Sequence, residues 1–347
     1  MVIRTRQAAT VRGSRIDGWG VKRCTGPVSD VVIPPLVATD PAEPLTLSGT
    51  LKDLVALGKP GITSMAAIVG AGTWLLAAPS LDPASLLRGS LGILGVTLLV
   101  MGAGALNMLI ERDVDALMSR TRNRPLAARR MSPIVALVAG LTMVMAALPL
   151  LALQGNTLTL GLGLFSLFLY VLVYTPMKRT SAWSLMVGAV PGAMPALMGG
   201  TLAAGRLEVA GIAMFAVVFL WQLPHFLAIS LYRESEYVAA GHKVVPTVVG
   251  VDTTKTLIIA TTAPLAALGV ALWPLGIGGP VFAFIALLVG AWFTMVCAQG
   301  FAAGARSRAD DDAWARRAFI ASLVWQTVLF GALAADRVLY ALFATPS

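Results

Sequence analysis

Charged residues are scarce in this chain, and so are cysteine and histidine. Asp, Glu, Lys and Arg make up 12% of the 347 residues, about half of the roughly 25% that a soluble protein of ordinary composition carries. The two cysteines, Cys24 and Cys297, and the two histidines are too few for a disulfide framework or a Cys- or His-rich metal site. Hydrophobic residues, by contrast, make up 57% of the chain. This composition predicts a polytopic membrane protein.

Nine apolar runs divide the chain. Each is about 18–23 residues long, the length that an α-helix needs to cross about 30 Å of hydrocarbon. Only helices and closed barrels satisfy their backbone hydrogen bonds in lipid, and the chain lacks the alternating ten-residue segments of a barrel. We therefore predict an all-α polytopic bundle of nine transmembrane helices. The runs lie near residues 61–79, 89–110, 131–153, 157–176, 183–204, 209–231, 256–275, 279–298 and 318–335.

Basic residues are distributed unevenly between the loops that join these runs. All but three of the 26 Lys and Arg residues fall on one side of the predicted membrane, and the exceptions are Arg88, Arg206 and Arg337. Because loops rich in Lys and Arg stay in the cytoplasm, we predict that the N-terminus and the loops after even-numbered spans are cytoplasmic. The same bias explains the net charge of +9 without a nucleic-acid partner.

The first 50 residues form a separate region, rich first in arginine and then in proline. This composition is typical of a disordered cytoplasmic tail, although a mitochondrial transit peptide is also rich in arginine and poor in acids. We predict a boundary near residue 50 and a membrane domain over 51–340. The segment has no clean amphipathic presequence, so we expect a multi-pass protein of a bacterial inner membrane, with a mitochondrial inner membrane as the alternative.

The densest charge in the chain directly follows an apolar run, in "ALNMLIERDVDALMSRTRNRPL" (105–126). Asn107, Glu111 and Asp115 are spaced four residues apart, so they share one face of a helix, whereas Asp113 points to the opposite face. Like charges at this spacing repel one another, and more strongly at a membrane edge. Oxygen ligands of this kind suit Mg²⁺, which binds one or two carboxylates together with a phosphate-bearing substrate.

Basic residues follow the acidic ones. "RTRNRP" supplies Arg120 and Arg124, and the short loop in "YVLVYTPMKRTSAW" (170–183) supplies Lys178 and Arg179. Guanidinium groups bind phosphate oxygens in a bidentate manner, so carboxylates for a metal beside these cations favour a diphosphate site. The alternative is that the four residues only anchor the topology of the membrane protein.

A second charged cluster follows the sixth run, in "WQLPHFLAISLYRESEYVAAGHKVVP" (221–246). Glu234 and Glu236 lie on the same predicted side of the membrane as the first acids. His225 lies inside the run, directly after Pro224. Ionisable groups within a span are functional candidates, but a neutral histidine can also simply hydrogen-bond a neighbouring helix.

Acids, Mg²⁺ and arginines at a membrane face fit a substrate that has a diphosphate head and an apolar tail. Ionising an allylic diphosphate requires that the charge of the leaving group be neutralised, while the tail lies between helices, away from water. This pattern favours prenyl transfer in the bilayer. An ion-coupled transporter is the alternative from another class, although transporter sites usually lie near the midplane of the membrane.

The motifs resemble those of the UbiA-type intramembrane prenyltransferases. The resemblance rests on Asn107, Glu111 and Asp115, on "RTRNRP", and on "YRESEYVAAG" (232–241), and it covers roughly residues 50–340. The spellings "ERDVDALMSRTRNRPL", "YTPMKRTSAW" and "WQLPHFLAISLYR" are similar to the branch of this family that farnesylates haem b. Other branches prenylate quinone or chlorophyll precursors, and such an acceptor is the nearest alternative.

The resemblance implies that the protein moves farnesyl from farnesyl diphosphate onto a vinyl group of haem b, giving haem O for terminal oxidases. It implies a catalytic, metal-binding set in which Asn107, Glu111 and Asp115 form a first Mg²⁺–diphosphate motif and Glu236 belongs to a second. His225 matches a Pro-His pair that could contact haem. Haem A synthase and oxidase assembly proteins are candidate partners.

The chain departs from the family pattern in three places. Glu236 stands where Asp is usual, and "GHKVVP" (241–246) places His242 and Lys243 where apolar residues are expected. The segment "KPGI" (59–62) lacks the customary arginine after its proline. These departures affect the assignments in the second loop more than the class of protein.

Overall fold

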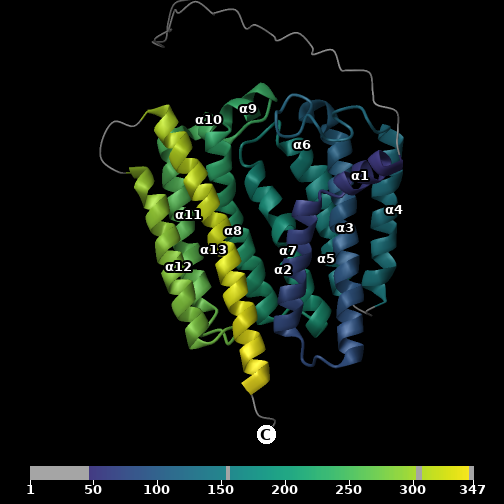
Figure 1. Ribbon diagram of the computed structural model, residues 1–347, viewed down its shortest axis with the longest axis vertical. Helices are drawn as coiled ribbons and strands as arrows, with labels where there is room; N and C mark the ends of the chain where they lie inside the picture. The colour runs from purple at the N-terminus through teal and green to yellow at the C-terminus, as the bar shows by residue number, and fades with distance from the viewer. Residues whose placement is uncertain (1–46, 154–156, 302–306, 344–347) are drawn as a thin grey trace, which may run out of the picture. The chain divides into compact units, whose positions relative to one another are not determined.

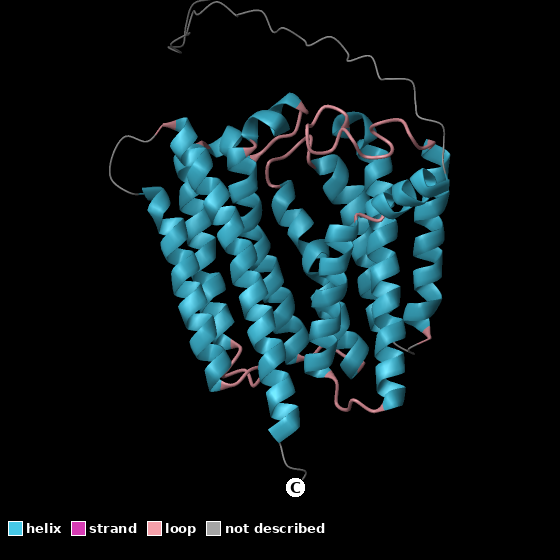
Figure 2. Ribbon diagram, in the orientation of Figure 1, coloured by secondary structure: helices cyan, strands magenta, loops and turns pink. Residues whose placement is uncertain are grey.

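The structure is a computed structural model that describes residues 47–153, 157–301 and 307–343. Of the predicted N-terminal tail, residues 1–46 lie outside this range, so the tail and its boundary stay predictions. Every regular element in the described part of the chain is a helix (Figure 2). The predicted all-α class is therefore confirmed for these residues.

Nine helical spans in the described residues are long and apolar enough to cross a membrane, which confirms the predicted number. They run side by side (Figure 1). The spans are α2 (Pro60–Ala77), α3 (Pro83–Asp115), α4 (Pro133–Ala152), α5 (Thr157–Phe168) with its continuation through the π-helix η1 (Leu169–Tyr174) and α6 (Thr175–Met177), α7 (Ser184–Ala204), α8 (Val209–Tyr232), α11 (Val251–Ala271), α12 (Pro280–Ala298) with the 3₁₀ turn η2 (Gln299–Phe301), and α13 (Arg308–Phe343).

Three short helices complete the described chain. They are α1 (Leu47–Leu57), α9 (Glu234–Ala239) and α10 (Val245–Val249). α1 contacts α3 and α4, and Figure 1 shows it lying across the upper part of the bundle. α9 and α10 belong to the loop that joins α8 to α11, which carries the second charged cluster.

The helix boundaries differ from the predicted runs most at α3 and α13. The second run was expected to end at 110, but α3 continues to Asp115 and carries all three members of the first cluster. The ninth run was expected to begin at 318, but α13 begins at Arg308, with Asp310 and Asp311 in its first turn. Acidic side chains stabilise the N-terminus of a helix through the macrodipole, which explains why the charged segment before residue 318 is the first part of α13.

Local sequence signals explain where the spans begin. Asp82 caps α3 by accepting hydrogen bonds from the amides of Ala84 and Ser85, both at 3.0 Å, a preferred N-cap arrangement. Proline suits the first helical position because it lacks the amide hydrogen that would stay unpaired there. It occupies the first position of α2, α3, α4 and α12.

Small residues allow α7 to lie in the middle of the bundle, against both α2 and α8. A Cβ atom on Gly199 would lie 2.1 Å from the carbonyl oxygen of Gly70 in α2, and one on Gly200 would lie 2.6 Å from Cα of Gly211 in α8. Glycine is therefore required at both positions, because the backbones approach too closely for any side chain. Small residues permit this kind of close helix packing in membranes.

We expect Gly199→Ala to lower the thermal stability of the protein, since the added methyl group must push α2 and α7 apart. Overpacking of this kind costs about 1–3 kcal/mol. Gly72→Ala is the matched control, because nothing lies within 4 Å of its Cβ position and alanine favours a helix. Thermal unfolding in detergent would measure both. Equal midpoints for the two variants would contradict the close approach of these helices.

Candidate active site

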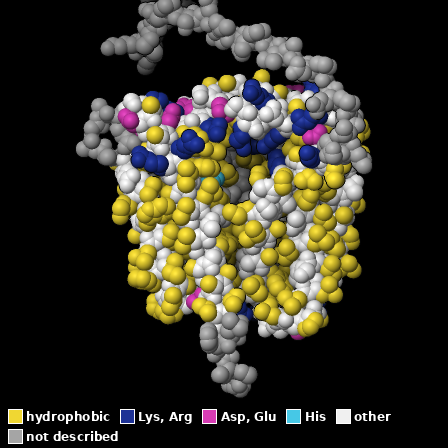
Figure 3. Space-filling view, in the orientation of Figure 1, with side chains coloured by type: hydrophobic (Ala, Val, Ile, Leu, Met, Phe, Trp, Pro, Cys, Tyr) yellow, Lys and Arg dark blue, Asp and Glu magenta, His cyan; other side chains and the backbone are white. Residues whose placement is uncertain are grey.

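Charged side chains gather at one end of the helices. Figure 3 shows Lys and Arg around the upper end of a hollow, with hydrophobic side chains covering most of the visible face below them. The loops at this end include the segments after α3, after α6 and after α8, which carry the predicted site residues. This distribution agrees with a bundle that has one strongly charged end, whereas its orientation in a membrane stays a prediction.

The face of α3 that carries Asn107, Glu111 and Asp115 is directed inward. Their exposed fractions are 0%, 7% and 4%. Asp113 lies on the opposite face with its side chain 83% exposed, 3.5 Å from Nε of Arg112. The structure therefore brings the three predicted residues together in a buried position, which we call the acid face.

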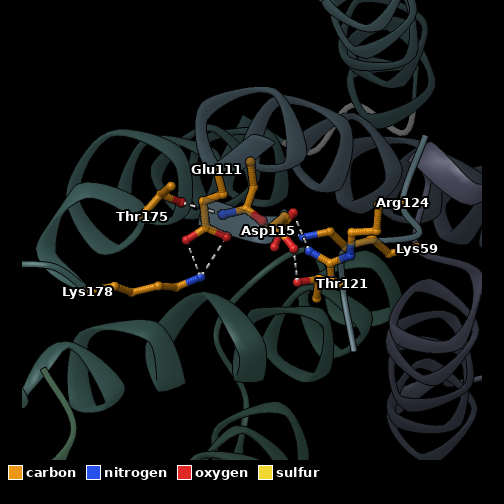
Figure 4. Close-up of polar contacts among 8 residues, drawn as sticks. Lys59, Glu111, Asp115, Thr121, Arg124, Thr175 and Lys178 are labelled. Carbon is orange, nitrogen blue, oxygen red and sulfur yellow. Dashed lines mark hydrogen bonds and ion pairs between the residues drawn. The ribbon is translucent and has the colours of Figure 1, made fainter. Parts of the chain in front are cut away.

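Lys178 neutralises Glu111. Its Nζ lies 2.8 Å from Oε1 and 3.0 Å from Oε2 of that carboxylate (Figure 4). The same Nζ lies 4.6 Å from the centre of the Tyr174 ring. Burial lowers the pKa of Lys178, but Tyr174 and Glu111 outweigh it, so the pKa is raised above its usual value. Lys178 therefore stays charged at neutral pH.

Arg124 neutralises Asp115 in the same way. Its Nη1 lies 2.7 Å from Oδ2 of Asp115. The hydroxyl of Thr121 donates to the backbone carbonyl of Asp115 at 2.8 Å, which holds the loop against the end of α3 (Figure 4). The loop after α3 thus folds back so that its arginine faces the acid of the preceding helix.

Asn107 lies deepest of the three. Its Nδ2 donates to the hydroxyl of Thr175 at 2.8 Å, and that hydroxyl donates to the carbonyl of Tyr170 at 2.8 Å. Pro176, which has no amide hydrogen, follows in the helix, and η1 precedes it. A π-helical turn often marks a functional site. Here it lets the fourth span reach Asn107 and directs Lys178 toward Glu111.

Lys59 is the site residue that the sequence did not predict. Its Nζ donates to Oδ1 of Asn107, and it precedes the first residue of α2 in a left-handed conformation with φ of 50°. Burial and the nearby charges of Arg124 and Lys178 lower its pKa to about 7. A cation is unfavourable at a helix N-terminus. The lysine directly before Pro60 was therefore the one sequence feature that could have indicated a functional role for Lys59.

The loop that carries the second cluster packs against the end of α3. Tyr237 and Ala240 contact Val114 and Met118. The amide of Lys243 donates to the carbonyl of Lys178 at 3.1 Å, which ties this loop to the loop after α6. The two charged segments, far apart in the sequence, therefore meet at the same place.

Arg120 and Arg179 lie at the rim of this meeting point. Both are exposed. Burial raises the pKa of Tyr237, and the positive charge of Arg120 partly opposes that shift. In the second loop, burial lowers the pKa of His242, and the positive charge of Arg179 adds to that shift. Two of the four predicted phosphate ligands, Lys178 and Arg124, thus contact the acid face, whereas the other two are exposed.

Glu236 lies in the second loop without joining the acid face directly. Its Oε1 is 2.8 Å from Nη1 of Arg233, three residues earlier, and its buried Oε2 has no hydrogen-bond partner among the described residues. Within that part of the chain, no three His, Cys, Asp or Glu side chains lie close enough together to hold a metal ion. The structure thus brings the loops together but does not place Glu236 in a shared cluster with Glu111 and Asp115.

His225 is buried between α8 and α13. Its Nδ1 lies 2.8 Å from the hydroxyl of Ser322, and its ring centre lies 4.6 Å from those of Trp221 and Phe319. These contacts are the ones that a histidine in a helix–helix interface makes. A contact with haem stays a prediction.

The donor atoms of the acid face fit Mg²⁺. They are carboxylate and amide oxygens, which magnesium prefers over nitrogen or sulfur. In the adjoining loop, Oε2 of Glu236, which has no hydrogen-bond partner in the described part of the chain, is a further carboxylate oxygen. Magnesium usually takes one or two carboxylates and completes its shell with water and phosphate, so a cluster of three protein acids is not needed.

The family model of the UbiA prenyltransferase family matches residues 64–323. The chain therefore belongs to the UbiA prenyltransferase family. Solved structures share its fold. The synthase of digeranylgeranylglyceryl phosphate has a TM-score of 0.69 at 14% identity and covers 83% of this chain and 98% of its own. A UbiA homologue from Archaeoglobus fulgidus, bound to GPP and Mg²⁺, has a TM-score of 0.60 at 15% identity over 81% and 99%.

Within that family the chain is similar to bacterial proteins named Protoheme IX farnesyltransferase. The protein from Sorangium cellulosum is 48% identical over 70% of this chain and 85% of its own length. Those from Anaeromyxobacter sp. and Myxococcus xanthus are 43% and 40% identical, over 81% and 84% of this chain and 92% and 97% of their own. The resemblance to this branch of the family is thereby confirmed.

The pair of Lys178 and Glu111 allows a test of the site by stability. Lys178→Met leaves a buried carboxylate without its cation, which should lower the free energy of unfolding by about 3–5 kcal/mol. Adding Glu111→Gln should recover part of that loss. Unfolding in a titration with denaturing detergent would measure both variants.

Arg130→Met is the matched control for this prediction. Arg130 pairs with Asp53 at 2.9 Å, but its side chain is 45% exposed, so its loss should cost about 0–1 kcal/mol. If Lys178→Met were as harmless as Arg130→Met, the ion pair on the acid face would not be a buried one.

Proposed function

We propose that this protein transfers the farnesyl group of farnesyl diphosphate to a vinyl group of haem b and so makes haem O. Relatives that are 40–48% identical over 70–84% of the chain are named Protoheme IX farnesyltransferase. The observation that carries the proposal is the acid face, because a buried row of oxygen ligands surrounded by cations suits a metal-bound diphosphate.

The cations around the acid face are arranged to hold the leaving group. Lys178 and Arg124 contact the carboxylates of Glu111 and Asp115 directly. A diphosphate bound to a metal ion at those carboxylates would therefore have its oxygens beside these two cations. Arg120 and Arg179 at the rim supply further donors. Guanidinium and ammonium groups that are already held in place stabilise developing charge without reorganising.

Mg²⁺ held by Asn107, Glu111 and Asp115 would supply additional positive charge to the diphosphate. Glu236 reaches the same region from the second loop. We propose it as a more distant member of the metal site, because its one unpaired oxygen faces no other described partner.

The reaction then follows from the charges. The bond between C1 of the farnesyl chain and the diphosphate oxygen breaks, and its electron pair leaves with the diphosphate, which the cations hold. The allylic cation accepts the π electrons of the haem vinyl group, so a carbon–carbon bond forms. Water adds to the resulting cation and loses a proton, which gives a hydroxyethylfarnesyl group. The apolar helices keep the first cation away from water.

We propose further that the charged end faces the cytoplasm of a bacterial cell and that the protein is a multi-pass protein of the inner membrane. The basic loops at this end support the orientation. An enzyme site at helix ends also differs from the midplane sites of transporters. Haem A synthase, which would consume the product, and oxidase assembly proteins remain the proposed partners.

The reaction can be tested with purified protein in detergent or vesicles. With farnesyl diphosphate, haem b and Mg²⁺, we expect a haem product whose mass is increased by one farnesyl group and one hydroxyl group. A parallel reaction with a quinone precursor is the control for the acceptor. Prenylation of the quinone precursor in the absence of any haem product would overturn the choice of haem b.

We expect Glu111→Gln and Asp115→Asn each to lower turnover by at least about 100-fold, since each removes charge from the metal site. Chelation of Mg²⁺ should abolish the activity of the unaltered protein, and added Mg²⁺ should restore it. Asp113→Asn is the matched control: it removes the same charge from the exposed face of the same helix. Its turnover should equal that of the unaltered protein.

The thermal midpoints of all three variants show whether the fold is retained. Full activity in the double variant Glu111→Gln/Asp115→Asn, or an equal loss in Asp113→Asn, would contradict the role of the acid face.

A further inference from the structure

The short helix α9 packs against the end of α3 and needs support from other segments. It has 6 residues, and an isolated helix shorter than about 12–15 residues is marginally stable. Gly241 closes its last turn with a left-handed φ of 74° and donates its amide to the carbonyl of Val238 at 2.9 Å. The amide of Lys243 then donates to the carbonyl of Lys178 at 3.1 Å. The end of α9 is therefore fixed to the loop after α6, which belongs to the candidate active site.

Arg308, the first residue of α13, holds the beginning of α9. Its Nη2 lies 2.7 Å from Oε2 of Glu234, the first residue of α9. The same Nη2, which carries two hydrogens, donates at 2.8 Å to the carbonyl of Leu231 in the last turn of α8. Between these two contacts the chain leaves helical geometry at Arg233, whose φ and ψ are −117° and 20°. One guanidinium nitrogen therefore bridges the break between α8 and α9.

The first turn of α13 is itself anchored, so Arg308 acts from a fixed position. Nζ of Lys255 on α11 lies 2.7 Å from Oδ1 of Asp311, and the two side chains are 6% and 10% exposed. Within α13, Nε of Arg308 lies 3.1 Å from Oδ1 of Asp312, which directs the long side chain. Arginine suits this place because its planar group presents several donors in fixed directions.

We propose that Arg308 is a positioning residue for the diphosphate site, because its contact with Glu234 keeps α9 against the end of α3 and the following segment against Lys178. This inference rests on the proposed function, in which Lys178 holds the diphosphate. Arg308 acts through α9, since its own polar contacts lie on α8, α9 and α13. A loop that is ordered before its ligand arrives loses less conformational entropy on binding, so Arg308 increases the affinity for diphosphate without contacting it.

Substitutions of the two partners separate this role from a general effect on stability. Arg308→Met and Glu234→Met each remove the contact between α13 and α9, and the double variant completes a mutant cycle. Arg308→Lys is the conservative variant, which keeps the charge. Asp312→Asn is the matched control, because it removes the acid that faces Arg308 within α13 and leaves the contact with Glu234 in place. Thermal midpoints report whether each variant folds, and Glu234→Met retains the test if Arg308→Met does not.

The first measurement is the hydrogen exchange of the backbone amides of residues 234–243 in the protein without ligand. Exchange reports local opening of the chain. We expect Arg308→Met and Glu234→Met each to accelerate exchange in this segment, and the double variant to resemble either single variant. Asp312→Asn should exchange at the rate of the unaltered protein.

The second measurement is the binding of inorganic pyrophosphate in the presence of Mg²⁺ by calorimetry. We expect Arg308→Met and Glu234→Met each to raise the Kd by about fivefold, which is within the range of coupling in one ion-pair network. The double variant should show the same Kd as either single variant, and Arg308→Lys should lie between them and the unaltered protein. The KM for farnesyl diphosphate should rise in parallel with the Kd, whereas Asp312→Asn should change neither.

Unchanged exchange in Arg308→Met would overturn the proposal, because the loop would then be held by other contacts. Faster exchange with unchanged pyrophosphate binding would overturn it as well, since the contact would then be structural only, and so would additive effects in the double variant. Pyrophosphate binding requires neither an acceptor nor transfer. If the acceptor proves to be a molecule other than haem b, the proposed function fails while these two measurements still decide the role of Arg308.

Discussion

The buried negative face of α3 is the constraint on which the rest of the site depends. Glu111 and Asp115 are 7% and 4% exposed, and buried carboxylates are stable only when they are paired and hydrogen-bonded. Their cations come from the loop after α6 and the loop after α3, while the segment before α2 supplies a lysine to Asn107. Three segments must therefore converge on one helix. The same need for positive charge makes the place suitable for a metal ion and a diphosphate.

Close packing of the helices fixes the positions of these converging segments. Gly199 and Gly200 let α7 lie against α2 and α8 without intervening side chains. The π-helical turn before Thr175 then brings a hydroxyl to Asn107 and an ammonium group to Glu111. The apolar part of the bundle thus positions the polar part. A prenyl chain requires both, since its diphosphate needs fixed charges and its allylic cation needs an environment without water.

The loop between α8 and α11 completes the charged end through backbone contacts. Its cap at Gly241 and the hydrogen bond from Lys243 to Lys178 bring His242 near Glu111. Glu236, which the family pattern associates with a second metal motif, is instead paired with Arg233 and only adjoins the acid face. The loop therefore contributes an acid whose buried Oε2 has no hydrogen-bond partner in the described part of the chain.

The sequence by itself determined the all-α class, the nine spans and the shared face of Asn107, Glu111 and Asp115, because hydrophobic length and helical period are properties of neighbouring residues. It also identified the family, through short motifs within single segments. Only the tertiary structure decided that Lys59 contacts Asn107 across 48 positions and that Lys178 contacts Glu111 across 67. Those pairings depend on how the helices pack and on where a π-turn and a capping glycine direct the chain. Such geometry follows from contacts between distant segments, which no local pattern of residues records.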